Sequence, residues 1–210
     1  LYFADEKTKQ LSGFYVPRGG LNTLLPLPVI GATLKKAGSV FSVKTHTSSN
    51  ENIIENVDWI HGACFMFKKE VIDRAGLLDE DFFLYSEEIE WCSRIKKYYK
   101  IGLFTKYKVI HLEGQSSNQL FESPAKGYYD IYSKKGRQLL LSNMVRIRKE
   151  FGVFWFLFHL IVYLIEIPVL FIYKIFHREI RPVSFAKNVF YIMGKMFVII
   201  RNKPYFYKAL

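Results

Sequence analysis

The sequence predicts an α/β domain followed by apolar, basic helices. Short apolar stretches, turn signals and helical periodicity alternate over residues 1–125. The composition becomes basic and aromatic at residues 126–150, and residues 151–210 hold two long apolar stretches. These changes divide the chain into an α/β part, a basic helical connector and a membrane-associating part, with those boundaries.

The composition points to an anionic partner and a sizeable core. Half of the residues are hydrophobic and the formal net charge is +11, so intrinsic disorder is excluded and an anionic partner is expected. The positive excess falls mostly after residue 125, beside apolar helices and outside any nucleic-acid motif. We therefore predict an anionic membrane surface as partner and exclude nucleic acid.

The two cysteines give no metal site. Cys64 and Cys92 form no C-x-x-C pair, and both lie in segments that the pattern predicts to be buried. Two free, buried thiols in a reducing compartment are expected, and a disulfide between them is the alternative.

The first 56 residues carry mainly turn signals. Pro17 to Gly20 predicts a turn, and two prolines within residues 26–28 exclude a regular helix there. The polar stretch from Thr45 to Asn56 predicts an exposed loop.

Strands and one short helix are predicted next. Val57 to Phe67 is expected to be a buried strand, with Gly62 and Ala63 allowing close approach of another backbone or of a sugar. A packing requirement for the glycine remains the alternative. A helix is predicted from Lys69 to Ala75, with Gly76 as its C-terminal cap. Ile101 to Phe104 and Lys108 to Ile110 are predicted strands, and His111 follows the second.

The start of one predicted helix is acidic and holds the candidate catalytic residues. Three carboxylates, Glu87, Glu88 and Glu90, follow an apolar run that stops at Ser86, the expected N-cap of a helix reaching Tyr99. Helical spacing lets Glu88 and Trp91 line a cleft together while Glu90 pairs with Arg94. Ordinary helix-start electrostatics remains the alternative to catalysis.

The C-terminal part predicts membrane association. Residues 126–150 are expected to be helical, and Phe151 to Tyr173 is long enough to cross a bilayer. Glu166 and Pro168 interrupt that stretch, and a carboxylate is costly in lipid. Positive charge lies on both flanks, which favours a surface anchor over a single crossing. Phe185 to Ile200 predicts a second apolar helix.

Four segments together resemble the C-terminal half of the catalytic domain of family-2 glycosyltransferases, especially the rhamnosyltransferase-like branch. The resemblance covers roughly a third of the chain, and its segments are Val57–Cys64, Gly76–Tyr85, Glu87–Arg94 and Val109–His111.

The resemblance implies part of a GT-A sandwich and an inverting transfer from a nucleotide-diphosphate sugar to a cell-surface glycan or lipid-linked acceptor. Glu88 falls at the family's general-base position, where the family usually has Asp, and Glu87 is the alternative base. Substrate contacts are implied for a further set, namely Trp59, Gly62, Ala63, Tyr85 and Trp91.

The resemblance also implies a divalent metal, Mg²⁺ or Mn²⁺, on the donor diphosphate. His111 is expected to help hold it, and the main aspartate ligands are expected upstream of Leu1. Polysaccharide biosynthesis at the cytoplasmic face of the cell membrane is the expected setting. A catalytically inactive membrane-bound module that binds glycan or nucleotide sugar, and a structural membrane protein, remain alternatives.

Overall fold

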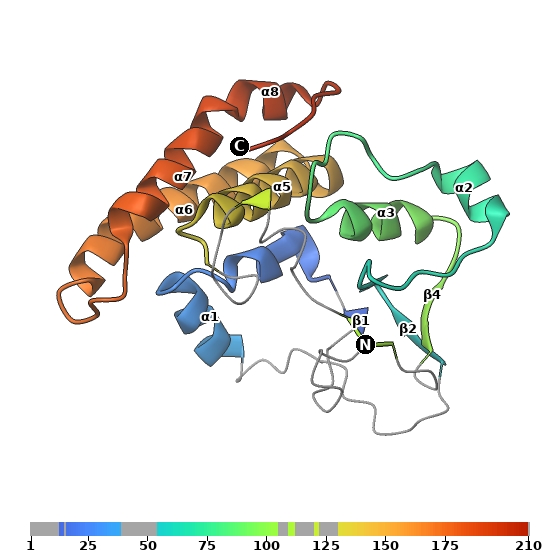
Figure 1. Ribbon diagram of the computed structural model, residues 1–210, viewed down its shortest axis with the longest axis horizontal. Helices are drawn as coiled ribbons and strands as arrows, with labels where there is room; N and C mark the ends of the chain where they lie inside the picture. The colour runs from blue at the N-terminus through green and yellow to red at the C-terminus, as the bar shows by residue number, and fades with distance from the viewer. Residues whose placement is uncertain are drawn as a thin grey trace. The chain divides into compact units, whose positions relative to one another are not determined.

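The computed structural model describes residues 13–14, 16–38, 54–104, 109–111, 120–121 and 130–209. Its chain forms two compact units, each built from several segments (Figure 1). The first unit comprises Leu1–Val16, Lys44–Asp79 and Glu87–Gln115, and the second comprises Pro17–Val43, Glu80–Ser86 and Ser116–Leu210. The boundaries of these units differ from those that the composition suggests, because residues 17–38 and 80–86 belong to the same unit as the C-terminal helices.

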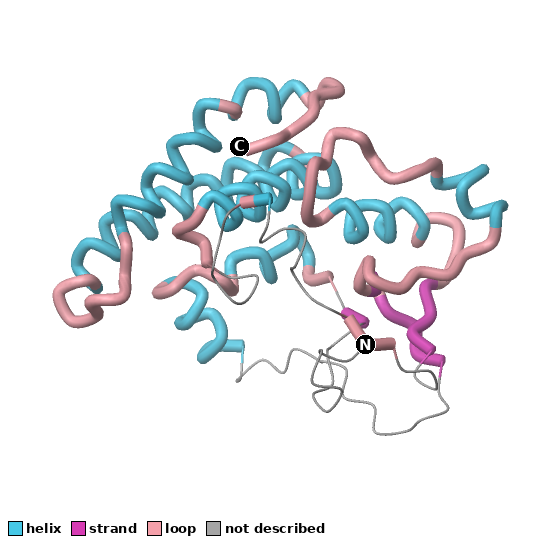
Figure 2. Tube along the Cα trace, viewed as in Figure 1, coloured by secondary structure: helices cyan, strands magenta, loops and turns pink. Residues whose placement is uncertain are grey.

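The first unit contains two short antiparallel sheets (Figure 2). Strand β2 (Ile54–Val57) pairs with β4 (Ile101–Phe104), and β1 (Gly13–Phe14) pairs with β3 (Trp59–Ile60). The predicted strand Ile101–Phe104 is confirmed. Of the predicted strand Lys108–Ile110, Ile110 forms a single bridge and Lys108 lies outside the described residues.

The predicted buried strand from Val57 to Phe67 is confirmed only at Val57 and at Trp59–Ile60, and is wrong from His61 on. Pairing stops at Ile60, and Gly62, Ala63 and Cys64 are exposed. Glycine weakens a strand because it has no side chain to pack against its neighbours. Cys64 is therefore a free exposed thiol, contrary to expectation, whereas Cys92 is free and buried as expected.

Two helices complete the described part of the first unit. Helix α2 (Lys69–Ala75) has the predicted bounds and ends at Gly76, whose φ of 74° a side chain would strain. Helix α3 (Glu87–Ile95) confirms the predicted helix but ends four residues earlier than Tyr99, which lies in turns. Both helices bury apolar side chains in one cluster that includes Val57, Val71 and Trp91.

The second unit is helical. Its elements are the 3₁₀ segment η1 (Arg18–Leu24), α1 (Ile30–Gly38), α5 (Lys134–Phe151), α6 (Val153–Tyr173), α7 (Pro182–Gly194) and α8 (Met196–Arg201). Helix α5 starts at Ser133, whose hydroxyl accepts a hydrogen bond from Gly136 N. The expected second apolar helix is divided at Lys195 into α7 and α8.

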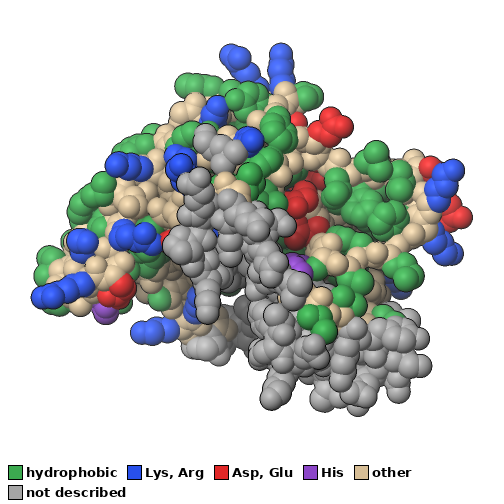
Figure 3. Space-filling model, viewed as in Figure 1, with side chains coloured by type: hydrophobic (Ala, Val, Ile, Leu, Met, Phe, Trp, Pro, Cys, Tyr) green, Lys and Arg blue, Asp and Glu red, His purple; other side chains and the backbone are tan. Residues whose placement is uncertain are grey.

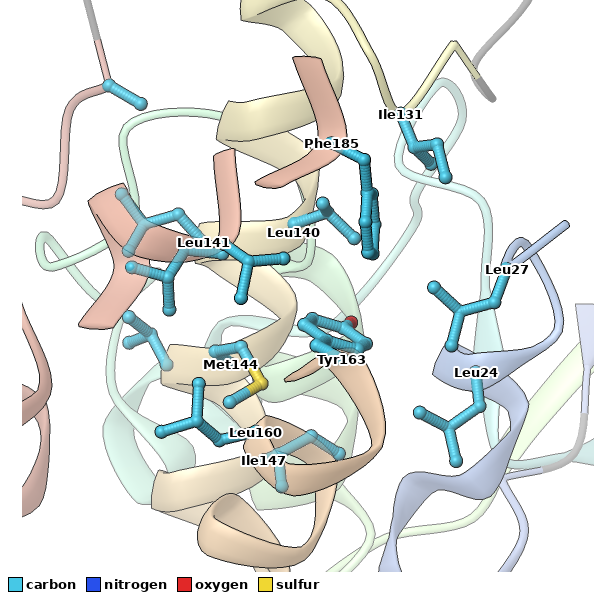
Figure 4. Close-up of a cluster of buried hydrophobic side chains, with 14 of the residues drawn as sticks. Leu24, Leu27, Ile131, Leu140, Leu141, Met144, Ile147, Leu160, Tyr163 and Phe185 are labelled. Carbon is cyan, nitrogen blue, oxygen red and sulfur yellow. The ribbon is translucent and has the colours of Figure 1, made fainter. Parts of the chain in front are cut away.

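Helix α5 lies at the centre of the second unit and contacts η1, α6, α7 and α8. Figure 4 shows its Leu140, Met144 and Ile147 packed with Tyr163 of α6 and Phe185 of α7. The predicted turn at Pro17–Gly20 is confirmed as the start of η1. Gly20 has a φ of 68°, and a Cβ there would lie 2.1 Å from Ile147 Cδ1, so this approach requires glycine.

The acidic turn at residues 79–81 is partly buried. Asp81 is buried, pairs with Lys149 of α5 at 2.7 Å and accepts a hydrogen bond from Tyr205 N. Its backbone carbonyl accepts another from Tyr207 N, next to the bridge between Phe82 and Tyr207. Asp81 thus links the segment at residues 205–207 to α5 within the second unit. The sequence pattern did not predict this role.

Candidate functional site

Helix α3 carries the candidate carboxylates in its first turn and Arg94 in its last turn, and Arg94 anchors the C-terminal end of the helix. The Arg94 guanidinium binds both carboxylate oxygens of Glu90 and donates to the carbonyls of Ala75 and Leu77. Trp91 Nε1 donates to the carbonyl of Gly76 at 2.8 Å. The predicted structural pair Glu90–Arg94 is therefore confirmed, and it also holds the chain that leaves α2. These bonds fix the axis of α3 and with it the position of its first turn.

Glu88 lies beside the backbone of Gly62. A Cβ built on Gly62 would lie 3.5–3.7 Å from Glu88 Cβ, Cγ and Cδ, which is ordinary van der Waals contact. Gly62 itself is exposed. Gly62 and Glu88, which the sequence predicted for one site, therefore lie together although α2 separates them in the chain. The backbone of Gly62 has no side chain to cover it beside the Glu88 carboxylate.

Glu87 precedes Glu88 in the first turn of α3, and both side chains are half-buried with a buried Oε2 atom. The Glu87 Oε2 has no hydrogen-bond partner among the described residues. Burial raises the pKa of the Glu87 carboxyl, although a hydrogen bond from its own backbone N–H opposes the shift. A carboxyl with a raised pKa is a stronger base once ionised, so Glu87 remains the alternative to Glu88 as general base.

His61 and His111 form a pair beside this surface. Their ring centroids lie 5.1 Å apart with an interplanar angle of 66°, an edge-to-face contact. Burial, and secondarily the charge of His111, lowers the pKa of His61 to about 4, so its imidazole is neutral near pH 7. His61 precedes Gly62 directly, so the same short segment contacts both Glu88 and His111.

The His pair fits only part of a metal site. Two imidazoles supply nitrogen ligands of the kind that transition metals accept. Within the described residues, however, no group of three or more His, Cys, Asp and Glu side chains is placed to hold an ion. A complete metal site therefore needs ligands from outside the described part of the chain.

Trp91 and Trp59 pack in the apolar cluster of the first unit. Trp91 is 4% exposed and meets Phe65 and Phe67 edge to face, and half-buried Trp59 packs against the same cluster. Trp91 also lines a pocket of about 280 Å³, together with Ile60, Phe67 and Tyr99. Substrate contacts by Trp91, Trp59 and exposed Ala63 stay predictions.

Tyr85 and Ser86 belong to the second unit. Both have positive φ values, 71° and 68°, which is strained for residues with side chains. The Ser86 hydroxyl donates to Asn143 Oδ1 at 2.8 Å, and its expected role as the cap of α3 stays a prediction. Tyr85 is buried, and its substrate contact stays a prediction.

Sequence reasoning missed His61. A single histidine has no periodicity, and only its contact with His111 sets it apart. The immediate proximity of His61 to Gly62, already a candidate, was the one available signal.

Comparison with known proteins supports sugar-transfer chemistry. The chain is 33% identical over 96 residues to the low-salt glycan biosynthesis hexosyltransferase Agl10 of Haloferax volcanii. The chain is related to a glycosyltransferase. The matched region covers 45% of this chain and 30% of that relative, so the chain spans about a third of the relative's length. No protein-family model matches the chain, and no solved structure matches it.

Proposed function

We propose that this chain is the acceptor-side part of an inverting, nucleotide-sugar-dependent glycosyltransferase of GT-A type. The full-length protein then moves a sugar from a nucleotide diphosphate to a cell-surface glycan or a lipid-linked acceptor. The relation to a hexosyltransferase supports the transferase class. The proximity of Glu88 to the backbone of Gly62 is the observation in the structure that carries the proposed site.

Inversion requires a base on the acceptor side. The acceptor hydroxyl loses its proton as its oxygen attacks the anomeric carbon, and a fixed carboxylate is suited to take that proton. Glu88 lies in the first turn of α3, where the helix dipole favours the ionised form of a carboxylate. The exposed backbone at Gly62 leaves room for a sugar ring next to it.

A divalent ion bound on the donor diphosphate would neutralise the charge that develops on the leaving group. Within this chain, His111 is the proposed contributor to that ion. His61 supports it by the edge contact that restricts the ring of His111.

A transfer assay tests the proposal. The full-length gene product is incubated with a panel of nucleotide sugars and lipid-linked or glycan acceptors, and the anomeric configuration of the product is read by NMR. Transfer with inversion is expected. Retention of configuration contradicts the inverting mechanism, and donor binding without transfer would favour the inactive binding module.

A further inference from the structure

The outward side of α6 is an unbroken apolar stripe. Every third or fourth residue of the helix faces outward and is exposed, and these residues form what we call the α6 stripe: Phe154, Phe158, Ile161, Ile165, Pro168 and Ile172. Phe154 is 73% exposed and Ile172 is 65% exposed. Such spacing follows one face of an α-helix along its whole length. With 21 residues, α6 is about 31 Å long, and the stripe from Phe154 to Ile172 is about 27 Å long.

The polar side chains of α6 point the other way. His159 and Glu166 are both 0% exposed and take part in hydrogen bonds inside the second unit. The stripe therefore carries no polar group at all. Monomeric soluble proteins rarely expose apolar patches larger than a few hundred Å², and a continuous patch of this kind marks an interaction surface.

The charges around the stripe are almost all positive. From Val153 to the end of the chain there are eight Lys and Arg against two Asp and Glu, and one of the two acids is the buried Glu166. Figure 3 shows Lys and Arg side chains near the turn between α6 and α7 and near α8, with hydrophobic surface between them. An apolar surface bordered by cations complements an anionic bilayer.

The packing of α6 on α5 determines how α6 is oriented relative to a bilayer. The inner side of α6 packs on α5, which holds an ion pair between Arg146 and Glu150 and also carries Arg148 and Lys149. Charged groups are costly in hydrocarbon, so α5 does not enter it. An α6 that stays packed on α5 therefore lies along the membrane surface instead of crossing it.

The outward side of α7 and α8 has a different composition. Its exposed residues include Val183, Phe190 and Phe197, but also Lys187 and Arg201. Mixed apolar and basic side chains suit the headgroup region, where Lys and Arg reach phosphates while aromatic rings stay in the interface.

We propose that the α6 stripe is the membrane-docking face of this protein. Helix α6 lies parallel to the surface of an anionic phospholipid bilayer with the stripe at the boundary of the acyl chains. Cations of α7 and α8, with Lys187 and Arg201 among them, bind lipid phosphates. This docking does not depend on the proposed transferase activity.

The first experiment measures binding of the full chain to vesicles. Wild type is expected to co-sediment with phosphatidylglycerol vesicles and more weakly with phosphatidylcholine vesicles. The double variant Ile161→Gln/Ile165→Gln should lower the partition coefficient about tenfold or more, because two buried apolar side chains are lost from the contact. Its matched control is Leu77→Gln/Leu78→Gln, at residues that are exposed and apolar but lie in the first unit.

A further double variant tests the cations. Lys187→Gln/Arg201→Gln should weaken binding to phosphatidylglycerol and leave binding to phosphatidylcholine unchanged. Near-UV circular dichroism of each variant shows whether it folds. Folded stripe variants that bind as well as wild type would overturn the proposal.

The second experiment measures depth. In a Cys64→Ser background, where Cys92 is shielded by burial, a single cysteine at position 154, 161 or 172 carries an environment-sensitive fluorophore. Quenching by lipids spin-labelled near the headgroup should be equally strong at all three positions, with little quenching from the chain ends. Deep quenching at 161 alone indicates a crossing helix and contradicts the parallel arrangement. If the fluorophores are shielded from solvent without lipid and light scattering gives twice the mass of the chain, the stripe is covered by a second copy of this chain. That result would contradict docking of the stripe on a bilayer.

Discussion

Glu166 of α6 holds the start of α1, where its Oε2 accepts a hydrogen bond from the backbone N–H of Ile30 at 3.0 Å. Its other oxygen accepts one from Val29 N at 2.8 Å. A helix start leaves backbone N–H groups without partners inside the helix, and a carboxylate is well suited to satisfy them. The carboxylate that interrupts the apolar sequence of α6 is thus internal to the second unit, and no charge faces outward along that helix.

Glu166→Ala should lower the free energy of unfolding of the second unit by about 1–3 kcal/mol, because two backbone donors lose their acceptor. Glu166→Gln should cost less, since one carbonyl oxygen remains to accept a bond. Urea denaturation followed by Trp155 fluorescence measures both. Glu179→Ala, at an exposed carboxylate, is the control, and equal stability of all three variants would count against the capping role.

Arg94 is expected to position α3. Arg94→Lys keeps the positive charge but loses the planar group that reaches Glu90 and two carbonyls together, and it should destabilise the first unit by about 1.5–3 kcal/mol. Denaturation monitored through Trp91 measures the loss. Arg74→Lys, at an exposed arginine of α2, is the matched control. An Arg94→Lys variant as stable as this control would show that the network does not fix the helix.

Glu87 should make stability depend on pH. Its pKa in the folded state is raised, so its contribution to stability is complete below the ordinary pKa of 4.5 and is lost as the pH rises through the raised value. Glu87→Gln should remove this loss, and its free energy of unfolding should fall less between pH 4.5 and 7 than that of wild type. Urea denaturation across that range decides the point. Parallel curves for both proteins would contradict burial of the Glu87 carboxyl.

His111→Ala should raise the concentration of Mn²⁺ needed for half-maximal transfer by the full-length protein, with little effect on acceptor KM. Mn²⁺ binding in the presence of nucleoside diphosphate, measured by electron paramagnetic resonance, gives a readout separate from activity. His177→Ala, in the second unit, is the control. Unchanged metal titrations in both measurements would contradict metal binding by His111 and leave it only its packing contact with His61.

Much of the helical structure was predictable because it depends on local signals. The Gly76 cap places the end of α2, the acidic first turn marks the start of α3, and uniform hydrophobicity marks α6. Strand β2 was missed, since Ile54–Val57 has little alternation of its own and its pairing partner β4 lies far along the chain. The burial predicted for Cys64 is wrong because β3 ends at Ile60, before Gly62, and the apolar sequence that follows is not a strand.

The candidate site was predictable only in part. The acidic run at Glu87 and Glu88 is visible in the sequence, and the match of segments joined it to Gly62 and His111. The environments of the two carboxyls were not predictable, because they depend on which side of α3 is covered in three dimensions. The pairing of His61 with His111 is likewise a contact between distant segments.

The most direct test of the account is turnover of the full-length Glu88→Gln protein. Glutamine keeps the size and the packing against Gly62 but cannot take a proton, so transfer should fall about 10²- to 10⁴-fold while donor binding stays nearly intact. Glu88→Asp should retain part of the activity, and Glu87→Gln should lose less than Glu88→Gln. Near-wild-type turnover of both Gln variants would contradict a catalytic role for the start of α3 and leave its carboxylates as helix-start electrostatics.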